Sequence, residues 1–197
     1  TLNFNKTDPK SKIFCAAILE WKKSKSQFDP ENDWRVVETA AGYTGSNTIS
    51  PMHAALLAAS VINGGRILSP TLVDSITNDD GIVLYAPKKT TIEPIISMRT
   101  TQQLQIMMRE TVLSGSAQKS FQGFSQGTYR GVEVGGKTGS LSGLKPKGRY
   151  DWFIGYAQLG DKKLAFASLC INEAYWYVKS SYIARKAVEN FFKLDQT

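Results

Sequence analysis

Apolar and polar positions recur at a helical spacing in three parts of the chain. The clearest part begins at Ser50 and Pro51, continues with an apolar residue every three to four positions, and stops at the 64–65 glycine pair. Serine is a favoured N-cap, proline suits the first helical position, and glycine ends helices. We therefore predict a helix there, and the same periodicity predicts helices over residues 101–112 and 180–192.

Three segments in the last third have the pattern of β-strands, at residues 132–134, 151–158 and 163–171. The last two are apolar on both faces, which is typical of strands at the centre of a sheet covered by helices. The tight link at Gly160 and Asp161 favours an antiparallel pair. These patterns predict an α/β (α+β) fold in which an antiparallel sheet is flanked by helices.

A small hairpin is predicted between these regions. Residues 72–76 and 82–85 are β-prone, and the segment 78–81 that joins them ends in Asp-Gly, a strong turn signal. We therefore interpret Asp79 and Asp80 as turn residues and not as a catalytic pair of carboxylates.

The first 38 residues have the weakest pattern. An apolar stretch at 13–19 precedes a lysine-rich stretch, which predicts one element followed by a loop. No run approaches the roughly 20 apolar residues of a membrane-spanning helix. The chain begins at Thr1 without a methionine or a signal-like pattern, so we expect it to be a piece of a longer protein.

Composition narrows the classes of function. The 197 residues carry a net charge of +7, but the lysines and arginines are scattered, which indicates a solvated basic surface that tolerates anionic envelope polymers. We do not expect nucleic-acid binding. The cysteines lack metal-ligand spacing, so neither a metal nor another cofactor is expected.

Several single side chains have a structural interpretation. We expect Trp152, Tyr156 and Cys170 to be core residues, because their strands are apolar on both faces. His53 falls in the first turn of the predicted helix and is expected to be structural or solvated. A disulfide between Cys15 and Cys170 stays open at this point.

The segment with the most informative chemistry is Gly-Gly-Lys-Thr-Gly-Ser at 135–140. The ammonium of Lys137, a neighbouring hydroxyl and a glycine on an accessible strand can hold a carboxylate while a peptide backbone approaches closely. Glycine-rich lysine loops also bind phosphate, but there the lysine leads into a helix. Here a loop and a strand are predicted after Lys137.

In this region the sequence resembles the penicillin-binding proteins, the D,D-transpeptidases of bacterial cell-wall synthesis. The resemblance covers residues 38–192 and places the elements in the family's order. The matching segments are Gly-Lys-Thr-Gly-Ser at 136–140, Trp-Phe-Ile-Gly-Tyr at 152–156, Thr-Ile-Ser-Pro-Met-His-Ala-Ala at 48–55, Asn-Gly-Gly at 63–65, and Pro70.

The family has three motifs, Ser-x-x-Lys with the acylated serine, Ser-x-Asn, and Lys-Thr-Gly. Only the third is in place here. Ser-x-x-Lys occurs at 116–119 and 142–145, about as often as chance supplies, and Ser-x-Asn occurs nowhere. The resemblance thus implies that residues 1–197 are the carboxy-terminal portion of a single transpeptidase domain, with 1–38 as a poorly matched lead-in, incomplete at its amino-terminal side. The nucleophile is expected upstream of Thr1.

For the third motif the resemblance also implies roles. Lys137 would add positive charge beside the nucleophile and hydrogen-bond the serine of the second motif. The hydroxyls of Thr138 and Ser140, with Gly139 between them, would bind the terminal carboxylate of a D-alanyl-D-alanine stem peptide or of a β-lactam. The Ser140 N–H would form half of the oxyanion hole. The parent protein is expected to be an enzyme, and this chain alone to be inactive.

Location and partners follow from the same resemblance. The parent is expected to be membrane-anchored and to face the periplasm or the outer surface of the membrane. A sheet divided between two segments would expose apolar surface, so we expect association with the missing amino-terminal segment or a dimer. Two alternatives stay open, namely a non-catalytic module that binds a peptide or partner, and a piece of a β-lactam sensor or β-lactamase. The Ser-Pro helix favours the biosynthetic enzymes.

Overall fold

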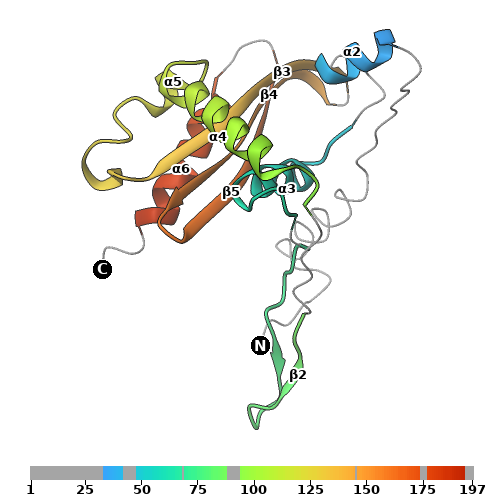
Figure 1. Cartoon of the computed structure of the whole chain (residues 1–197), viewed down its shortest axis with the longest axis vertical. Helices are drawn as coiled ribbons and strands as arrows, with labels where there is room; N and C mark the ends of the chain where they lie inside the picture. Colours follow the sequence, from blue (N-terminus) through green and yellow to red (C-terminus); the bar gives the residue numbers. More distant parts are fainter. Residues whose placement is uncertain are drawn as a thin grey trace.

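The computed structural model describes residues 33–41, 48–67, 69–87, 94–144, 146–173 and 177–193. Its centre is an antiparallel sheet in the order β3-β4-β5, formed by Glu133–Leu144, Lys147–Leu159 and Lys162–Asn172 (Figure 1). The predicted fold class and the predicted β4–β5 pair are thereby confirmed. The apolar stretch at 13–19 lies outside the described residues.

Strand β3 is much longer than the predicted strand at 132–134. It pairs with β4 along its whole length, from Glu133 opposite Gln158 to Leu144 opposite Lys147. The prediction of a loop after Lys137 is therefore wrong. At the far end of this ribbon, the Tyr150 hydroxyl donates to the Pro146 carbonyl at 2.8 Å and supports the turn.

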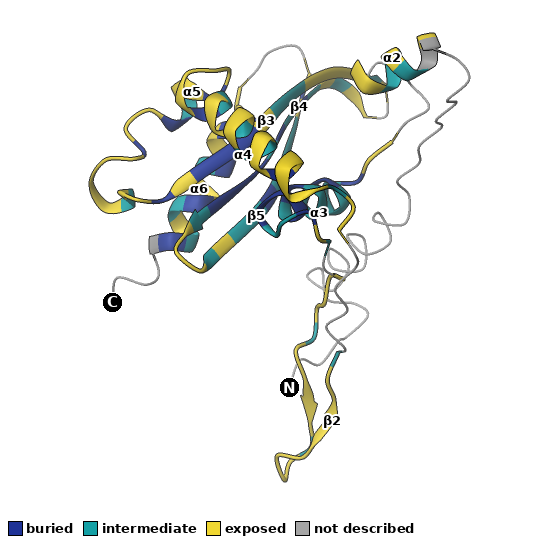
Figure 2. Ribbon diagram, in the orientation of Figure 1, coloured by how far each residue is buried: buried dark blue, intermediate teal, exposed yellow. Residues whose placement is uncertain are grey.

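Helices cover both faces of the sheet. Helices α3 (Pro51–Ile62) and α4 (Met98–Leu113) lie on the face that carries Tyr156. Helix α6 (Ser180–Lys193), together with the short α5 (Gln118–Phe121), lies on the face that carries Phe153. Figure 2 shows the buried part of the strands between these helices. The larger buried cluster is formed by Val112, Ala117, Phe121, Phe124, Val132, Val134, Phe153, Ala157, Phe166, Ala184, Val188 and Phe192.

The predicted helices are all present. The Ser50 hydroxyl accepts from the His53 N–H at 3.2 Å and caps α3, as its sequence indicates. The predicted helix at 101–112 begins earlier, at Met98, because the Ser97 hydroxyl caps it by accepting from the Thr100 N–H at 3.1 Å. Helix α6 extends the prediction by a single residue. The described part of the first 38 residues adds α2 (Asp33–Ala41).

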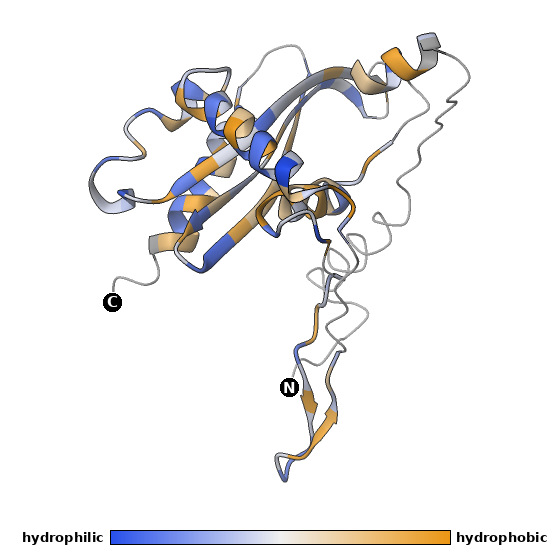
Figure 3. Ribbon diagram, in the orientation of Figure 1, coloured by the Kyte–Doolittle hydropathy of each residue, from blue (hydrophilic) through white to orange (hydrophobic). Residues whose placement is uncertain are grey.

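The predicted hairpin is present but shorter. Its strands are β1 (Ile76–Thr77) and β2 (Val83–Tyr85), so the predicted strand at 72–76 is wrong apart from its last residue. Asn78 forms the turn by accepting from the Ile82 N–H at 2.7 Å, and Gly81 has a positive φ of 80°. The hairpin extends away from the sheet (Figure 1), and Figure 3 shows hydrophobic positions in both of its arms.

The residues predicted to lie in the core differ in how far they are buried. Tyr156 is 1% exposed, as expected, whereas Trp152 is half-buried. Cys170 is a free, half-buried thiol on β5, because β5 lies at an edge of the described sheet and not at its centre. Burial, with a further contribution from Asp151, raises the pKa of that thiol. Cys15 lies outside the described residues.

Candidate functional site

The four predicted site residues lie together in the middle of β3, at one edge of the described sheet. Strand pairing sets their directions, because opposite residues share a face. Thr138 pairs with Phe153, so the side chains of Thr138 and Ser140 lie on the α6 face. Lys137 points to the opposite face, where α3 and α4 lie. Lys137 and Ser140 are exposed, and Thr138 is half-buried.

Aromatic rings explain the two glycines before Lys137. A Cβ added at Gly136 would lie 2.3 Å from the ring of Phe153. One added at Gly135 would lie 2.7 Å from the ring of Tyr156. Both faces of β3 are therefore filled by β4 side chains at this point, and no larger residue fits.

Gly139 is different, because its nearest neighbour leaves room for a side chain. A Cβ added there would meet only the Trp152 Cβ at 3.4 Å, an ordinary contact distance. Packing within the described residues therefore does not require glycine at this position. A glycine that internal packing does not require is consistent with the close approach of a backbone that belongs to a ligand or to another segment.

The Lys137 ammonium is at the surface and donates to the Thr138 carbonyl at 2.6 Å. The spacing of residues 131–138 also satisfies the phosphate-loop pattern Gly-x-x-x-x-Gly-Lys-Thr, so spacing alone does not separate the two kinds of site. The structure separates them, because β3 runs on to Leu144 where a phosphate loop would enter a helix.

The sequence did not indicate the contact that Thr138 makes. Its hydroxyl lies 2.7 Å from the hydroxyl of Ser116, which precedes α5. In the sequence, Ser116 is distinguished only by its Ser-x-x-Lys spacing to Lys119. The two residues are 22 positions apart in the chain, and no local sequence pattern predicts a contact between residues so far apart.

Neither Ser-x-x-Lys occurrence opens a buried helix. Ser116 lies in a turn, and the helix that follows has four residues. Ser142 lies within β3 and is exposed. The structure thus places both serines away from the helix N-terminus at which the family's nucleophile is expected.

Asp151 lies opposite Ser140 and anchors α6 to the sheet. Asp151 is 4% exposed, and its carboxylate accepts from the N–H of Ser180 at 2.7 Å and from the Ser180 hydroxyl at 3.0 Å. A carboxylate at a helix N-terminus is favoured by the helix dipole. Its side chain is occupied by this structural contact beside the site.

Tyr156, on β4, links the paired strands β3 and β4 to α4. Its hydroxyl donates to the Gln105 carbonyl at 3.3 Å. Burial raises the pKa of Tyr156 to about 12, while the positive charge of Arg109 opposes the shift and the negative charge of Glu133 adds to it. The side chain is therefore neutral and structural at physiological pH.

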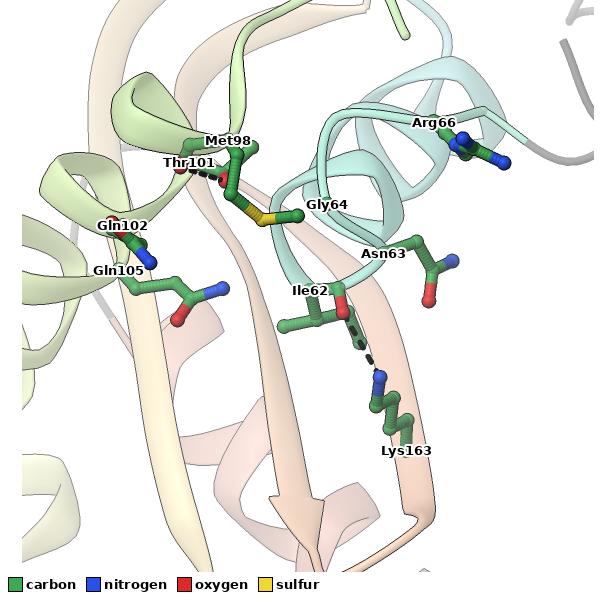
Figure 4. Close-up of a pocket in the computed structure, with 9 residues that line it drawn as sticks. All are labelled: Ile62, Asn63, Gly64, Arg66, Met98, Thr101, Gln102, Gln105 and Lys163. Atoms are coloured by element: carbon green, nitrogen blue, oxygen red, sulfur yellow. Dashed lines mark hydrogen bonds between the residues drawn. The ribbon is translucent and has the colours of Figure 1, made fainter. Parts of the chain in front are cut away.

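A separate cavity of about 570 Å³ lies between α3, α4 and the start of β5 (Figure 4). Lys163 donates to the Ile62 carbonyl at 3.0 Å, and Gln105 donates to the Val61 carbonyl at 2.7 Å. Both side chains satisfy carbonyls at the carboxyl end of α3, where a positive charge also suits the helix dipole. These two side chains are thus used in holding the helix, and Lys137 does not line the cavity.

The described residues contain neither a candidate metal cluster nor a candidate membrane-spanning helix. Within those ranges, no three His, Cys, Asp or Glu side chains gather closely enough to hold a metal ion. Of the helices that the structure describes, none combines the length and apolarity that crossing a membrane requires.

Comparison with known proteins gives a consistent result. Residues 19–193 match the family model of the penicillin binding protein transpeptidase domain. Penicillin-binding protein 1B of Haemophilus influenzae is 24% identical over 155 residues, which cover 79% of this chain and 18% of that protein.

Solved structures show the same fold. Penicillin-binding protein A of Mycobacterium tuberculosis, as its imipenem acyl-enzyme complex, gives a TM-score of 0.66 at 23% identity, covering 85% of this chain and 36% of the other. The D,D-transpeptidase domain of a peptidoglycan glycosyltransferase from Eggerthella lenta gives 0.62 at 19% identity, covering 86% and 36%. The chain therefore spans little more than a third of these structures. With a family model matched over most of its length and the fold shared, the chain belongs to the penicillin-binding protein transpeptidase domain family.

Proposed function

We propose that this chain supplies the carboxylate-binding strand of a serine acyl-enzyme D,D-transpeptidase. The strand holds the terminal carboxylate of a D-alanyl-D-alanine stem peptide or of a β-lactam, and the nucleophilic serine comes from sequence outside this chain. The observation that carries the proposal is the position of two hydroxyls, those of Thr138 and Ser140, on one side of an accessible strand that also presents Lys137. Two hydroxyl donors on one face suit a carboxylate, and the Lys137 ammonium on the opposite face of the same strand adds positive charge.

Each residue has a distinct role in this proposal. Thr138 and Ser140 donate to the carboxylate, and Gly139 lets the ligand backbone lie close to β3. The Ser140 N–H contributes half of the oxyanion hole, a donor that is typically worth on the order of 100-fold to 1,000-fold in rate. Lys137 leaves the Thr138 carbonyl, hydrogen-bonds the serine of the second motif and adds positive charge beside the nucleophile.

A β-lactam is the second ligand of the same strand. The similar Mycobacterium tuberculosis protein was solved as acyl-enzyme complexes with imipenem, ceftriaxone and penicillin G. Both ligand classes present a carboxylate near a reactive carbonyl, so one pair of hydroxyls serves both. No cofactor takes part in this proposal, and nucleic acid is not a partner.

We further propose that residues 1–197 are the carboxy-terminal portion of one transpeptidase domain. Its parent is membrane-anchored and works in the periplasm or on the outer face of the membrane. Strand β5 pairs only with β4 among the described strands, which leaves an edge for the amino-terminal segment or a second copy. This chain alone is inactive because it lacks the nucleophile.

The alternatives differ in chemistry. A non-catalytic module would bind a peptide without acylation, and the positions of Ser116 and Ser142 outside a buried helix are compatible with it. A β-lactam sensor or β-lactamase would be acylated but would not join stem peptides. Acylation by penicillin, followed by a stem-peptide transfer assay, separates these three classes.

The direct test uses the full-length protein that contains these residues. Ser140→Ala is expected to lower the second-order rate of acylation by penicillin about 10- to 150-fold, because a hydrogen bond to a charged group is lost. Ser142→Ala is the matched control, since Ser142 lies two residues along the same face of β3 and is exposed. Equal effects of the two variants would contradict the proposal.

A further inference from the structure

None of the sequence motifs predicts the contact between the side chains of Ser116 and Thr138. The two hydroxyl oxygens are 2.7 Å apart, on a turn and a strand separated by 22 residues. We propose that Ser116 is a positioning residue that holds the Thr138 hydroxyl with its hydrogen directed at the ligand carboxylate. The inference rests on the proposed carboxylate-binding role of Thr138 and extends it to a residue outside the three motifs.

The turn that carries Ser116 is held on both sides. The Gly115 N–H donates to the Glu110 carbonyl at 2.8 Å, and the Ala117 N–H donates to the Thr111 carbonyl at 3.0 Å. Ala117 is fully buried in the larger core cluster. The backbone on each side of Ser116 is thus tied to the end of α4 or to the core, and its hydroxyl has a defined position.

Close packing at Gly115 further fixes the position of this turn. A Cβ at that position would lie 2.9 Å from the Thr111 Cα, so the turn approaches the helix as closely as a glycine allows. The helix and the turn together place the Ser116 side chain against β3. A short, tightly packed turn beside β3 holds the Ser116 hydroxyl in one position, as a hydrogen-bond donor with a fixed direction requires.

Hydroxyl chemistry sets the direction of the hydrogen bonds. Each hydroxyl has one hydrogen to donate and two lone pairs to accept with, whereas a carboxylate only accepts. When a carboxylate is bound, the hydrogen of Thr138 must point to it. Ser116 can then donate to the Thr138 oxygen, which polarises the outward bond and removes the competing orientation. Without Ser116, the Thr138 hydroxyl is free to rotate away.

The geometry favours this role over that of a nucleophile. The hydroxyl of Ser116 is occupied by Thr138, and Lys119 is an exposed residue of the four-residue α5. Among the hydrogen bonds of the described residues, none joins Ser116 to Lys119. A lysine that activates a serine must lie within hydrogen-bond reach of it.

The test is a double-mutant cycle in the full-length protein. Ser116→Ala is expected to lower the second-order rate of penicillin acylation about 3- to 10-fold, as one neutral hydrogen bond. The loss should be in initial binding and not in the acylation step. In a Thr138→Val background, Ser116→Ala should cause no further loss, because the hydroxyl that it orients is gone. Ser116→Thr, which keeps a hydroxyl, should recover most of the rate.

The matched control is Ser114→Ala. Ser114 lies two residues before Ser116, at the end of α4, and its hydroxyl donates to the Glu110 carboxylate at 2.9 Å. This variant should acylate like wild type. Equal melting temperatures for the variants exclude a folding defect. Additive losses from Ser116→Ala and Thr138→Val, or a Ser116→Ala variant with the wild-type rate, would overturn the inference.

A wild-type protein that forms no penicillin adduct would contradict the proposed function but would still leave the inference decidable. Equilibrium binding of acetyl-D-alanyl-D-alanine, followed by NMR line shifts, then replaces acylation as the readout. Weaker binding in Ser116→Ala, with no further weakening when Ser116→Ala is added to Thr138→Val, would support the positioning role. Unchanged binding in Ser116→Ala, or no binding to wild type, would overturn it.

Discussion

At the scale of single residues, the glycines of β3 serve two different purposes. Gly136 is required by the molecule itself, because the Phe153 ring occupies the space where its side chain would be. Gly139 has no such internal neighbour, and its Cβ position is open to an ordinary contact. The glycines of one short motif therefore divide into one that shapes the core and one that is available to a ligand.

This division predicts opposite outcomes for two alanine substitutions. Gly136→Ala is expected to destabilise the fold by about 1–3 kcal/mol through overpacking against Phe153. Gly139→Ala is expected to change stability little but to slow penicillin acylation of the full-length protein, because a methyl group intrudes on the ligand backbone. Urea unfolding and acylation rates check the pair. A Gly136→Ala variant as stable as wild type would show that the ring of Phe153 moves aside.

The site was only partly predictable at this scale. Lys137, Thr138, Gly139 and Ser140 could be singled out because they are adjacent and chemically distinctive. Ser116 could not, because its contact with Thr138 depends on where a turn meets a strand 22 residues later.

At the scale of elements, local signals predicted the helices well. Helix α3 has a serine cap, an early proline and two terminal glycines with positive φ, and all of them act as expected. The length of β3 was not predictable. Its second half contains glycine and serine without alternation, and it becomes a strand because β4 pairs with it along the whole ribbon.

The contact between β4 and α4 gives a pH-dependent prediction. Burial raises the pKa of Tyr156 to about 12, above its usual value near 10, so the folded state keeps a proton that the unfolded state releases. Stability contributed by the neutral side chain is complete below pH 10 and is lost between about pH 10 and 12. At pH 11 the loss is about 1.4 kcal/mol.

Urea unfolding at pH 8 and pH 11 measures this contribution. Tyr156→Phe has no ionisable group, so its stability should fall less between the two pH values than that of wild type. Tyr182→Phe is the control, because Tyr182 is 49% exposed on α6. The same fall in Tyr156→Phe as in wild type would show that Tyr156 does not titrate abnormally.

At the scale of the whole molecule, the described sheet is covered by helices on both faces but has two open edges. Strand β3 presents the site at one edge, and β5 lies at the other. The family relation and the coverage of about a third of similar structures fit a chain that works as part of a larger domain. The sequence makes the same prediction independently, because only the third of the family's three motifs is in place.

The most direct test of the account is to locate the acylated serine. The full-length protein is incubated with penicillin, digested, and mapped by mass spectrometry, and residues 1–197 alone are treated in parallel. We predict an adduct on a serine upstream of Thr1 and none on the isolated chain. An adduct within residues 1–197, at Ser116 or elsewhere, would contradict the assignment of this chain as the carboxylate-binding part of the enzyme without its nucleophile.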